Sequence, residues 1–157
     1  MTVSGRMGKM DIREIEDNEL EKLLYLYEHL HERDEKSPAP DRIREVWKQI
    51  QGDKNIKYFG VFDEERLVSS CAIIIVPNLT RACRPYAVIE NVVTHNDYRR
   101  NGYGQDVLKA AVEYAWDQNC YKVMLMTGRL NEETFKFYES AGFDRNAKQA
   151  FVIKRMG

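Results

Sequence analysis

The sequence predicts a mixed α/β fold with a central sheet of about six to seven strands and about four helices. Apolar stretches typical of strands and amphipathic stretches typical of helices follow one another in the order β-α-α-β-β-β-α-β-α-β. A helical stretch at 105–118 connects two apolar strands, at 88–94 and 121–127, so a helix forms the crossover between them. At 157 residues the chain is large enough to bury one hydrophobic core.

The N-terminal residues differ in character from the rest of the chain. Residues 1–9 contain glycine and charge without apolar periodicity, so we expect a flexible extension. We expect a single domain over residues 10–157, which begins with a strand at 11–15.

Two helices are predicted before the sheet continues. Asp17 or Asn18 is expected to cap the first helix, which runs to about His31. A polar, proline-bounded linker at 32–40 leads to the second helix at 41–51. The apolar residues expected to face inward are Leu20, Leu23, Leu24, Tyr27, Leu30, Ile43, Val46, Trp47 and Ile50.

The middle of the chain reads as a hairpin followed by a further strand. Strands at 56–63 and 67–76 flank a short polar turn, as in an antiparallel hairpin. A basic loop at 77–85 precedes the strand at 88–94. After the crossover helix and the strand at 121–127, the remaining elements are a short helix at 131–140 and a last strand at 149–156.

The turn after the strand at 88–94 has the composition of a pyrophosphate site. It comprises Arg99, Arg100, Asn101, Gly102, Tyr103 and Gly104. The two glycines allow backbone N–H groups to approach a ligand closely, and the helix that follows adds its own N–H donors and dipole. The two arginines add positive charge.

Three known phosphate-binding patterns are candidates for this turn. The nucleotide P-loop requires a lysine and a hydroxyl residue after the last glycine, and Gly104 is followed by neither. The dinucleotide fingerprint requires a third glycine, where Val107 stands, and an acidic residue on the next strand, where 121–127 has none. The pattern [Q/R]-x-x-G-x-[G/A] fits at Arg99, Gly102 and Gly104.

This third pattern is the coenzyme A loop of the GNAT superfamily of N-acetyltransferases, which the chain resembles over roughly residues 10 to 156. The stretch 131–143 also resembles that family's second signature, N-x-x-[small]-x-x-[F/L]-Y-x-x-x-G-F. The resemblance implies the GNAT fold, with the strands at 88–94 and 121–127 parallel and splayed around the pantetheine arm. It implies acetyl-CoA as co-substrate and no metal.

Within the family, the local sequence is most similar to that of glucosamine-6-phosphate N-acetyltransferases. The shared residues are Ile89-Glu90, Cys120-Tyr121-Lys122 and Phe137-Tyr138-Glu139. Asn91, however, replaces an aspartate, and the loop after the strand at 121–127 is longer and lacks an acidic residue. These departures count against an amino-sugar acceptor.

Acetyl transfer to an amine requires a base, because deprotonating a lysine-like amine at pH 7 costs about 4.6 kcal/mol. Glu90 is the candidate, since it interrupts an apolar strand near the expected splay. It could instead be a structural carboxylate on the solvent face or paired with an arginine, and His95 is an alternative base. Backbone N–H groups near Val92 and Val93 are expected to stabilise the oxyanion, with Thr94 also lining the cofactor. Alternation would place Glu90, Val92 and Thr94 on one face.

The second signature supplies two further candidates. Tyr138 is the candidate general acid for the departing thiolate, because its hydroxyl is protonated at pH 7; it could instead be a core aromatic residue. Asn131 would bind the pantetheine amide or cap its own helix. For the acceptor, Arg81, Arg84 and Arg129 suggest a small amine with a carboxylate or phosphate, although they could instead be solvated loop charges.

Composition limits the other function classes. With 24 basic and 25 acidic residues the net charge is −1, which argues against nucleic acid or an anionic membrane as partner. Cys71, Cys83 and Cys120 lack metal-ligand spacing and are typical of reduced thiols in a cytoplasmic protein. We expect an N-acetyltransferase acting on a small amine. A protein lysine or N-terminal acetyltransferase, a non-catalytic acyl-CoA sensor, and a homodimeric state are left open.

Overall fold

The computed structural model describes residues 10–30 and 37–157. The predicted extension at 1–9 and most of the predicted linker at 32–40 lie outside the described residues. The chain divides into two compact units, Met1–Leu125 and Met126–Gly157, and each is considered by itself. None of the helices within the described ranges has the length and apolar character needed to cross a membrane.

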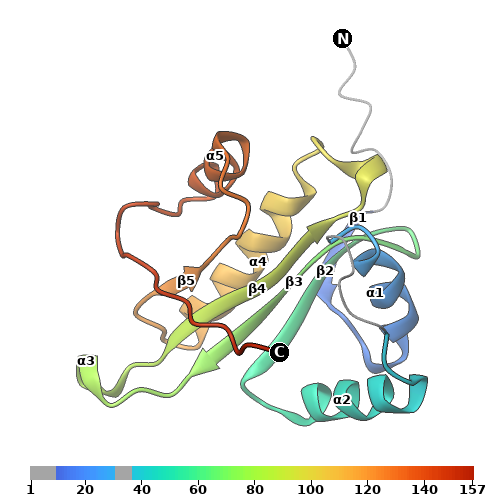
Figure 1. The fold of residues 1–157 in the computed structure, drawn as a ribbon, viewed down its shortest axis with the longest axis horizontal. Coiled ribbons are helices and arrows are strands. Elements are labelled where there is room, and N and C mark those ends of the chain that lie inside the picture. Colours follow the sequence, from blue (N-terminus) through green and yellow to red (C-terminus); the bar gives the residue numbers. More distant parts are fainter. Residues whose placement is uncertain (1–9, 31–36) are drawn as a thin grey trace. The chain divides into compact units, whose positions relative to one another are not determined.

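The first unit is built on a mixed sheet with the strand order β1-β2-β3-β4-β5 (Figure 1). The strands are β1 (Met10–Glu14), β2 (Ile56–Asp63), β3 (Arg66–Val76), β4 (Tyr86–Thr94) and β5 (Val123–Leu125). The first four pair antiparallel in sequence order, and β5 pairs parallel to β4. The predicted mixed α/β class and hairpin are therefore confirmed, as is the crossover from β4 to a parallel β5.

Helices cover the two faces of this sheet (Figure 1). On one face lie α1 (Leu20–Tyr27) and α2 (Pro40–Gly52), where the Trp47 ring packs edge-on against Tyr58 of β2 at 5.4 Å. On the other lies α4 (Tyr103–Asp117), which contacts Phe59 of β2 through Tyr114 at 5.6 Å. Because neighbouring residues on a strand point to opposite faces, Tyr58 and Phe59 identify the two layers. The buried residues of α4 are Tyr103, Gly104, Val107, Leu108, Ala111 and Ala115.

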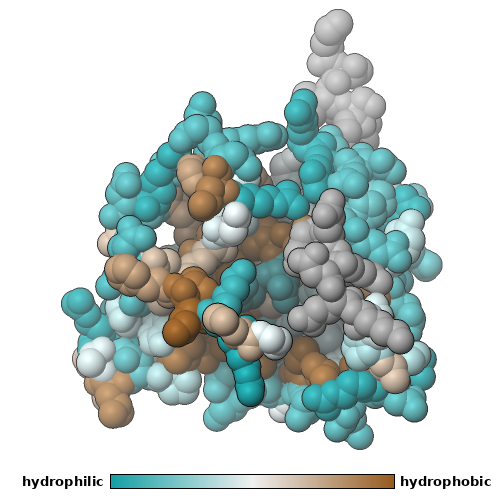
Figure 2. Space-filling view, viewed as in Figure 1, coloured by the Kyte–Doolittle hydropathy of each residue, from teal (hydrophilic) through white to brown (hydrophobic). Residues whose placement is uncertain are grey.

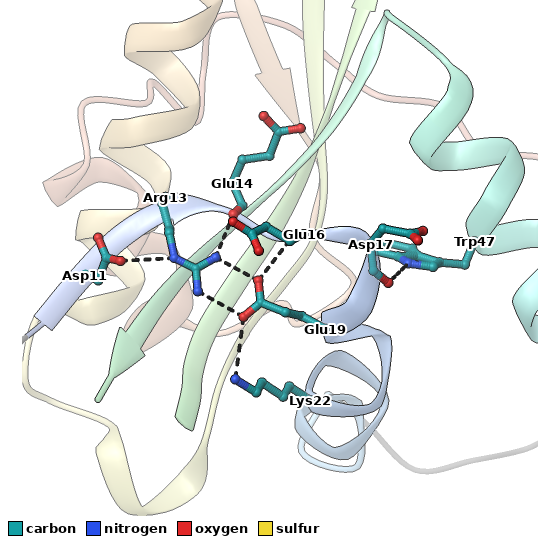
Figure 3. A network of polar contacts seen from close by, with 8 residues as sticks. All are labelled: Asp11, Arg13, Glu14, Glu16, Asp17, Glu19, Lys22 and Trp47. Carbon is teal, nitrogen blue, oxygen red and sulfur yellow. Dashed lines mark hydrogen bonds and ion pairs between the residues drawn. The ribbon is translucent and has the colours of Figure 1, made fainter. Parts of the chain in front are cut away.

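A salt-bridge network, rather than Asp17 or Asn18, organises the start of the first helical region (Figure 3). Glu19 accepts two hydrogen bonds from the Arg13 guanidinium, at 2.7 and 2.9 Å, and a third from the Glu16 N–H at 2.9 Å. The hydrogen bonds from Arg13 are the main reason that the pKa of the buried Glu19 is lowered to about 2. The predicted cap is wrong because the N-cap residue is Glu16, whose N–H is satisfied by the Glu19 carboxylate three residues later, already held by Arg13.

The first helix is also shorter than predicted. A 3₁₀ turn at Asp17–Glu19 precedes α1, which ends at Tyr27 rather than near His31. The N–H groups of His29 and Leu30 donate to carbonyls three residues back, at 3.0 and 3.1 Å. Such bonds tighten and terminate a helix. Helix α1 therefore ends at Tyr27, with Glu28 as its C-cap residue.

The basic loop before β4 contains one short helical turn, α3 (Thr80–Cys83), that the sequence did not predict. Arg81, Ala82 and Cys83 all have positive φ angles, between 55° and 61°. The turn is therefore left-handed, which is uncommon for residues other than glycine.

The second unit contains α5 (Glu132–Ser140), within one residue of its predicted bounds. Arg145 holds it from outside by donating to Glu132 at 2.9 and 3.1 Å and to Glu139 at 2.6 Å. The predicted last strand at 149–156 is not formed, so the described residues give a sheet of five strands rather than about six to seven. Apolar alternation alone does not make a strand without a hydrogen-bonded neighbour.

Much of the surface in Figure 2 is hydrophilic, as expected for a chain in which 31% of residues are charged.

Candidate active site

The predicted coenzyme A loop lies between β4 and α4. Gly102 is the N-cap residue of α4 and has a left-handed backbone, with φ 80° and ψ 8°. Its carbonyl accepts the first helical hydrogen bond, from the Asp106 N–H at 3.0 Å. A residue with a side chain would be strained in this conformation, which explains why glycine stands here.

Side chains of the loop leave its outer surface positively charged. Arg99 and Arg100 are exposed, whereas Tyr103 and Gly104 are buried in the first turn of α4. The Asn101 side-chain amide donates to the carbonyls of Tyr98 and Arg99, at 3.1 and 3.3 Å, and so fixes the curvature of the loop. Two exposed arginines in front of a helix N-terminus fit the pyrophosphate of a nucleotide-like ligand.

Strand β4 contains a β-bulge just before this loop. Ala72 of β3 pairs with Glu90 and Ser70 with Val93, so one residue of β3 faces two of β4. Asn91, inside the bulge, has a φ of 54°. A bulge leaves one residue outside the ladder and re-aims its neighbours. The structure thus combines a bulge and a helix N-terminus within a single short segment.

The bulge corrects the predicted facing of Val92 and Thr94. Val93 packs into the core beneath α1 and α2, so alternation turns Val92 and Thr94 to the opposite face of the sheet. Before the bulge, Tyr58, Ala72 and Glu90 form one row across the sheet, on the α2 face. Glu90 therefore shares its face with Val93. The extra residue in the bulge shifts the alternation by one position.

Glu90 is exposed at the surface of this row. Among the described residues, no arginine or lysine forms an ion pair with it, so the arrangement does not support the structural role in which an arginine holds the carboxylate. An exposed carboxylate beside the bulge is available to accept a proton from an incoming amine.

Three polar residues meet at the bulge next to Glu90, and the sequence did not predict that they would lie together. The Tyr27 hydroxyl is enclosed, and Tyr58 and Asn91 approach it without a well-aligned hydrogen bond. Burial, followed by the nearby Tyr58, raises the pKa of Tyr27, while Asn91 opposes the rise. Tyr27, Tyr58 and Asn91 are thus close together at the bulge. The sequence signal for this cluster was limited to two tyrosines, Tyr27 and Tyr58, that carry a hydroxyl at positions where apolar side chains are expected.

His95, the alternative base, has a structural role in this segment. It is 4% exposed, and its Nδ1 accepts a hydrogen bond from the Asp97 N–H at 3.1 Å. One imidazole nitrogen is therefore occupied by the backbone. The Glu90 carboxylate, by contrast, is exposed.

The two acceptor-side arginines of the first unit have different surroundings. Arg84 donates to the carbonyls of Asn119 and Cys120, both at 3.4 Å, and so ties the loop before β4 to the end of α4. Arg81 lies with its guanidinium 5.7 Å from the Tyr121 ring. Arg81 is the freer of the two to reach a ligand.

The candidates in the second unit are positioned by α5. Asn131 is the N-cap residue, and its Oδ1 accepts from the Thr134 N–H at 2.9 Å. Tyr138 packs edge-on against Phe137 and Phe143, at 5.0 and 6.4 Å. Arg129 precedes α5, and its N–H donates to the Thr127 hydroxyl at 3.1 Å.

Comparison with known proteins places the chain in one family. Residues 20–143 match the model of the acetyltransferase (GNAT) family, so the protein belongs to it and has the α/β GNAT fold. Members of this family transfer acetyl groups from acetyl-CoA.

Two solved structures are similar to this chain over nearly its whole length. A solved structure from Agrobacterium tumefaciens strain C58, provisionally assigned as an acetyltransferase, is 39% identical, with a TM-score of 0.86, and the match covers 92% of this chain and 99% of that one. A transcriptional regulator from Bacillus halodurans C-125 is 28% identical, with a TM-score of 0.79, over 92% and 99% of the two chains.

A curated relative has a more specific description. Glucosamine 6-phosphate N-acetyltransferase of Trypanosoma brucei brucei is 34% identical over 84 residues, which are 54% of this chain and 55% of that protein. The chain therefore spans about half the length of the curated relatives that it matches.

Proposed function

We propose that the protein is an N-acetyltransferase that moves an acetyl group from acetyl-CoA to the primary amine of a small molecule, by direct attack in a ternary complex. The observation that carries the proposal is the segment from β4 to α4. There an exposed carboxylate, a β-bulge and a glycine-opened helix N-terminus follow one another within residues 90–104.

The loop would hold the pyrophosphate of coenzyme A. Arg99 and Arg100 supply charge, Asn101 fixes the curvature, and the left-handed Gly102 opens α4 next to Tyr103 and the buried Gly104. These groups fit the ligand because the first N–H groups of a helix have no partner in the helix itself. Acetyl-CoA would supply the acetyl thioester, and the backbone of Val92, Val93 and Thr94 would line the cofactor.

Two side chains, Glu90 and Tyr138, would each take part in one proton transfer. Glu90 accepts the proton of the amine, directly or through water, so that the nitrogen lone pair can form a bond to the thioester carbon. Backbone N–H groups at the bulge stabilise the charge that develops on the oxygen. The carbon–sulfur bond then breaks, and Tyr138 donates a proton to the departing sulfur. Asn131 binds the pantetheine amide through the side-chain donor that the helix cap does not use.

The acceptor is proposed to be a small amine with an anionic group. The Trypanosoma relative, named for glucosamine 6-phosphate, supports an acceptor that carries both groups. Arg81 and Arg129 are the proposed anion contacts, together with Arg84 if it exchanges its carbonyl partners. Charge-assisted hydrogen bonds of this kind favour carboxylate and phosphate.

A panel of amines tests the proposal. Thiol release from acetyl-CoA should be fastest with amines that carry phosphate or carboxylate, and Arg81→Ala should raise the KM of such an amine, while the KM of acetyl-CoA changes little. Gly128→Ala is a matched control, because an added Cβ there meets no atom within 4 Å. Preference for cationic polyamines would contradict the acceptor class. If none of the amines in the panel supports thiol release from acetyl-CoA, the proposed enzymatic activity is contradicted.

A further inference from the structure

Two histidines that the proposed reaction does not use stack on each other beside the coenzyme A loop. The ring centroids of His29 and His95 are 4.0 Å apart, with 38° between the ring planes. His29 lies just after α1, and His95 lies between β4 and the 3₁₀ turn η3 (Asn96–Tyr98). Arg99, the first residue of the loop, follows η3 directly. The stack therefore joins α1 to the segment that sets where the loop begins.

His95 is bonded to its surroundings at three points. Its backbone N–H donates to the Val68 carbonyl at 2.8 Å, and its carbonyl accepts from the Tyr98 N–H at 2.9 Å. Its Nδ1 accepts from the Asp97 N–H at 3.1 Å and so caps η3. Because Nδ1 accepts a hydrogen bond, it carries no proton, and the imidazole is neutral in this geometry.

The charged and titratable groups around this ring come from three elements. The α1 segment contributes His29 and Tyr25, the latter with its ring 6.3 Å away. From η3 come Tyr98, edge-on at 5.4 Å, and the exposed Asp97 carboxylate, 4.0 Å from Nδ1. Strand β3 contributes the Arg66 guanidinium. Among these described groups, two are cationic or can become so, and only Asp97 is acidic.

We propose that His95 is a positioning residue for coenzyme A and that the His29–His95 stack makes cofactor binding sensitive to pH. The inference rests on the proposed function, since it takes residues 99–104 as the coenzyme A loop. A proton on Nδ1 turns the acceptor of the Asp97 bond into a donor, so η3 loses its cap. His29, with its ring 4.0 Å away, also disfavours a positive charge on the His95 ring. Loss of the cap releases the segment that leads into Arg99.

The direction of the effect follows from the environment of the ring. Burial, followed by His29, lowers the pKa of His95, so the neutral form persists below the ordinary histidine range. Protons then favour states in which the cap is broken. Cofactor affinity should be complete above about pH 6.5, the ordinary pKa of histidine, and should fall as the pH drops through the lowered value.

The test is the dissociation constant of free coenzyme A, measured by titration calorimetry at about pH 8 and about pH 5. His95→Asn is the key variant, because asparagine caps a helical turn without titrating. It should retain most of the wild-type affinity at the higher pH. The wild type should then lose affinity on acidification by about fivefold more than His95→Asn, the size of a lost cap. Titration of the ligand's own phosphates is the same for both proteins.

Two further variants complete the experiment. His95→Leu removes the acceptor and should bind weakly at both pH values, which asparagine should rescue. His29→Gln removes the group that, after burial, lowers the pKa of His95, and it should move the acid transition to higher pH, because His95 then protonates more easily.

The outcomes separate the inference from the proposed function. Equal pH responses of the wild type and His95→Asn would overturn the inference. A wild-type affinity that rises on acidification, relative to His95→Asn, would also overturn it, because an imidazolium would then attract the phosphates by charge. A wild type that binds no coenzyme A at about pH 8 would overturn the proposed function itself.

Discussion

Two glycines with left-handed backbones serve opposite ends of two helices, with different consequences. Gly102 opens α4 with a φ of 80°, and the N–H groups of that first turn have no acceptor within the helix itself. Gly142 follows α5 with a φ of 100°, and there the backbone satisfies itself. The N–H of Gly142 donates to the Glu139 carbonyl at 2.9 Å, and that of Phe143 to the Tyr138 carbonyl at 3.1 Å. This is a Schellman closure.

The role of a left-handed glycine therefore depends on whether it begins or ends a helix. A helix start presents donors that an anion can use, whereas a closed helix end offers a ligand little. Substitutions near Gly102 should therefore act on ligand binding and turnover, and substitutions near Gly142 should act on stability. The predictions below test this division, from the largest expected effect to the smallest.

Glu90→Gln should give the largest loss of activity. Removing a general base lowers kcat/KM by roughly 10²–10⁴-fold, and the loss should shrink at high pH, where the amine deprotonates by itself. Stability should change little, because Glu90 is exposed and has no ion pair within the described chain. Steady-state kinetics across pH, paired with a melting curve, would show this. A pH profile parallel to that of the wild type would reassign Glu90 to structure.

Tyr138 belongs to the same signature as Gly142, but Tyr138→Phe should act on turnover rather than on stability. The change keeps the ring that packs against Phe137 and Phe143 and removes only the hydroxyl. If that hydroxyl donates a proton to sulfur, kcat and kcat/KM should fall together by roughly 10–100-fold, with coenzyme A affinity unchanged. Wild-type turnover with a lowered melting temperature would instead identify a core aromatic residue.

Gly142→Ala should destabilise the protein without weakening coenzyme A binding. A left-handed residue with a Cβ costs roughly 1–2 kcal/mol, although an added Cβ would meet no atom within 4 Å. Denaturant unfolding measures the loss, and Gly52→Ala, with equal space and no positive φ, is the control. A large fall in coenzyme A affinity would mean that this signature binds the ligand directly.

Tyr27→Phe should give the smallest change, and in the opposite direction. The Tyr27 hydroxyl is enclosed and makes no well-aligned hydrogen bond among the described residues, although Tyr58 and Asn91 are near it. Removing it should raise the free energy of unfolding by up to about 1 kcal/mol, since a buried unpaired hydroxyl is destabilising. A loss of stability in denaturant unfolding would show that the hydroxyl has a partner in solution.

The sequence predicted the elements better than their details. Strands β2, β3 and β4 and helices α2, α4 and α5 follow from apolar periodicity and lie within about two residues of the predicted bounds. The bulge at Asn91 could not be predicted, because the extra residue is visible only against its partner strand. The Arg13–Glu19 pair likewise depends on where β1 and η2 meet.

The site was predicted unevenly for a similar reason. A local motif identified residues 99–104, and the structure confirms that they form a turn opening a helix. The side chains that meet Asn91 at the bulge come from α1 and β2, far away in the sequence, so no spacing rule connects Tyr27 or Tyr58 to it. The roles of Glu90, Tyr138 and the three arginines stay predictions.

The most direct test of the account is the melting temperature of the wild type with and without coenzyme A. At a ligand concentration of about 100 times Kd, binding should stabilise the fold by roughly 2.7 kcal/mol. Gly104→Val should abolish the gain, because a branched side chain at this buried position blocks the approach of the ligand to the backbone. A wild-type melting curve that millimolar coenzyme A leaves unmoved would contradict the account.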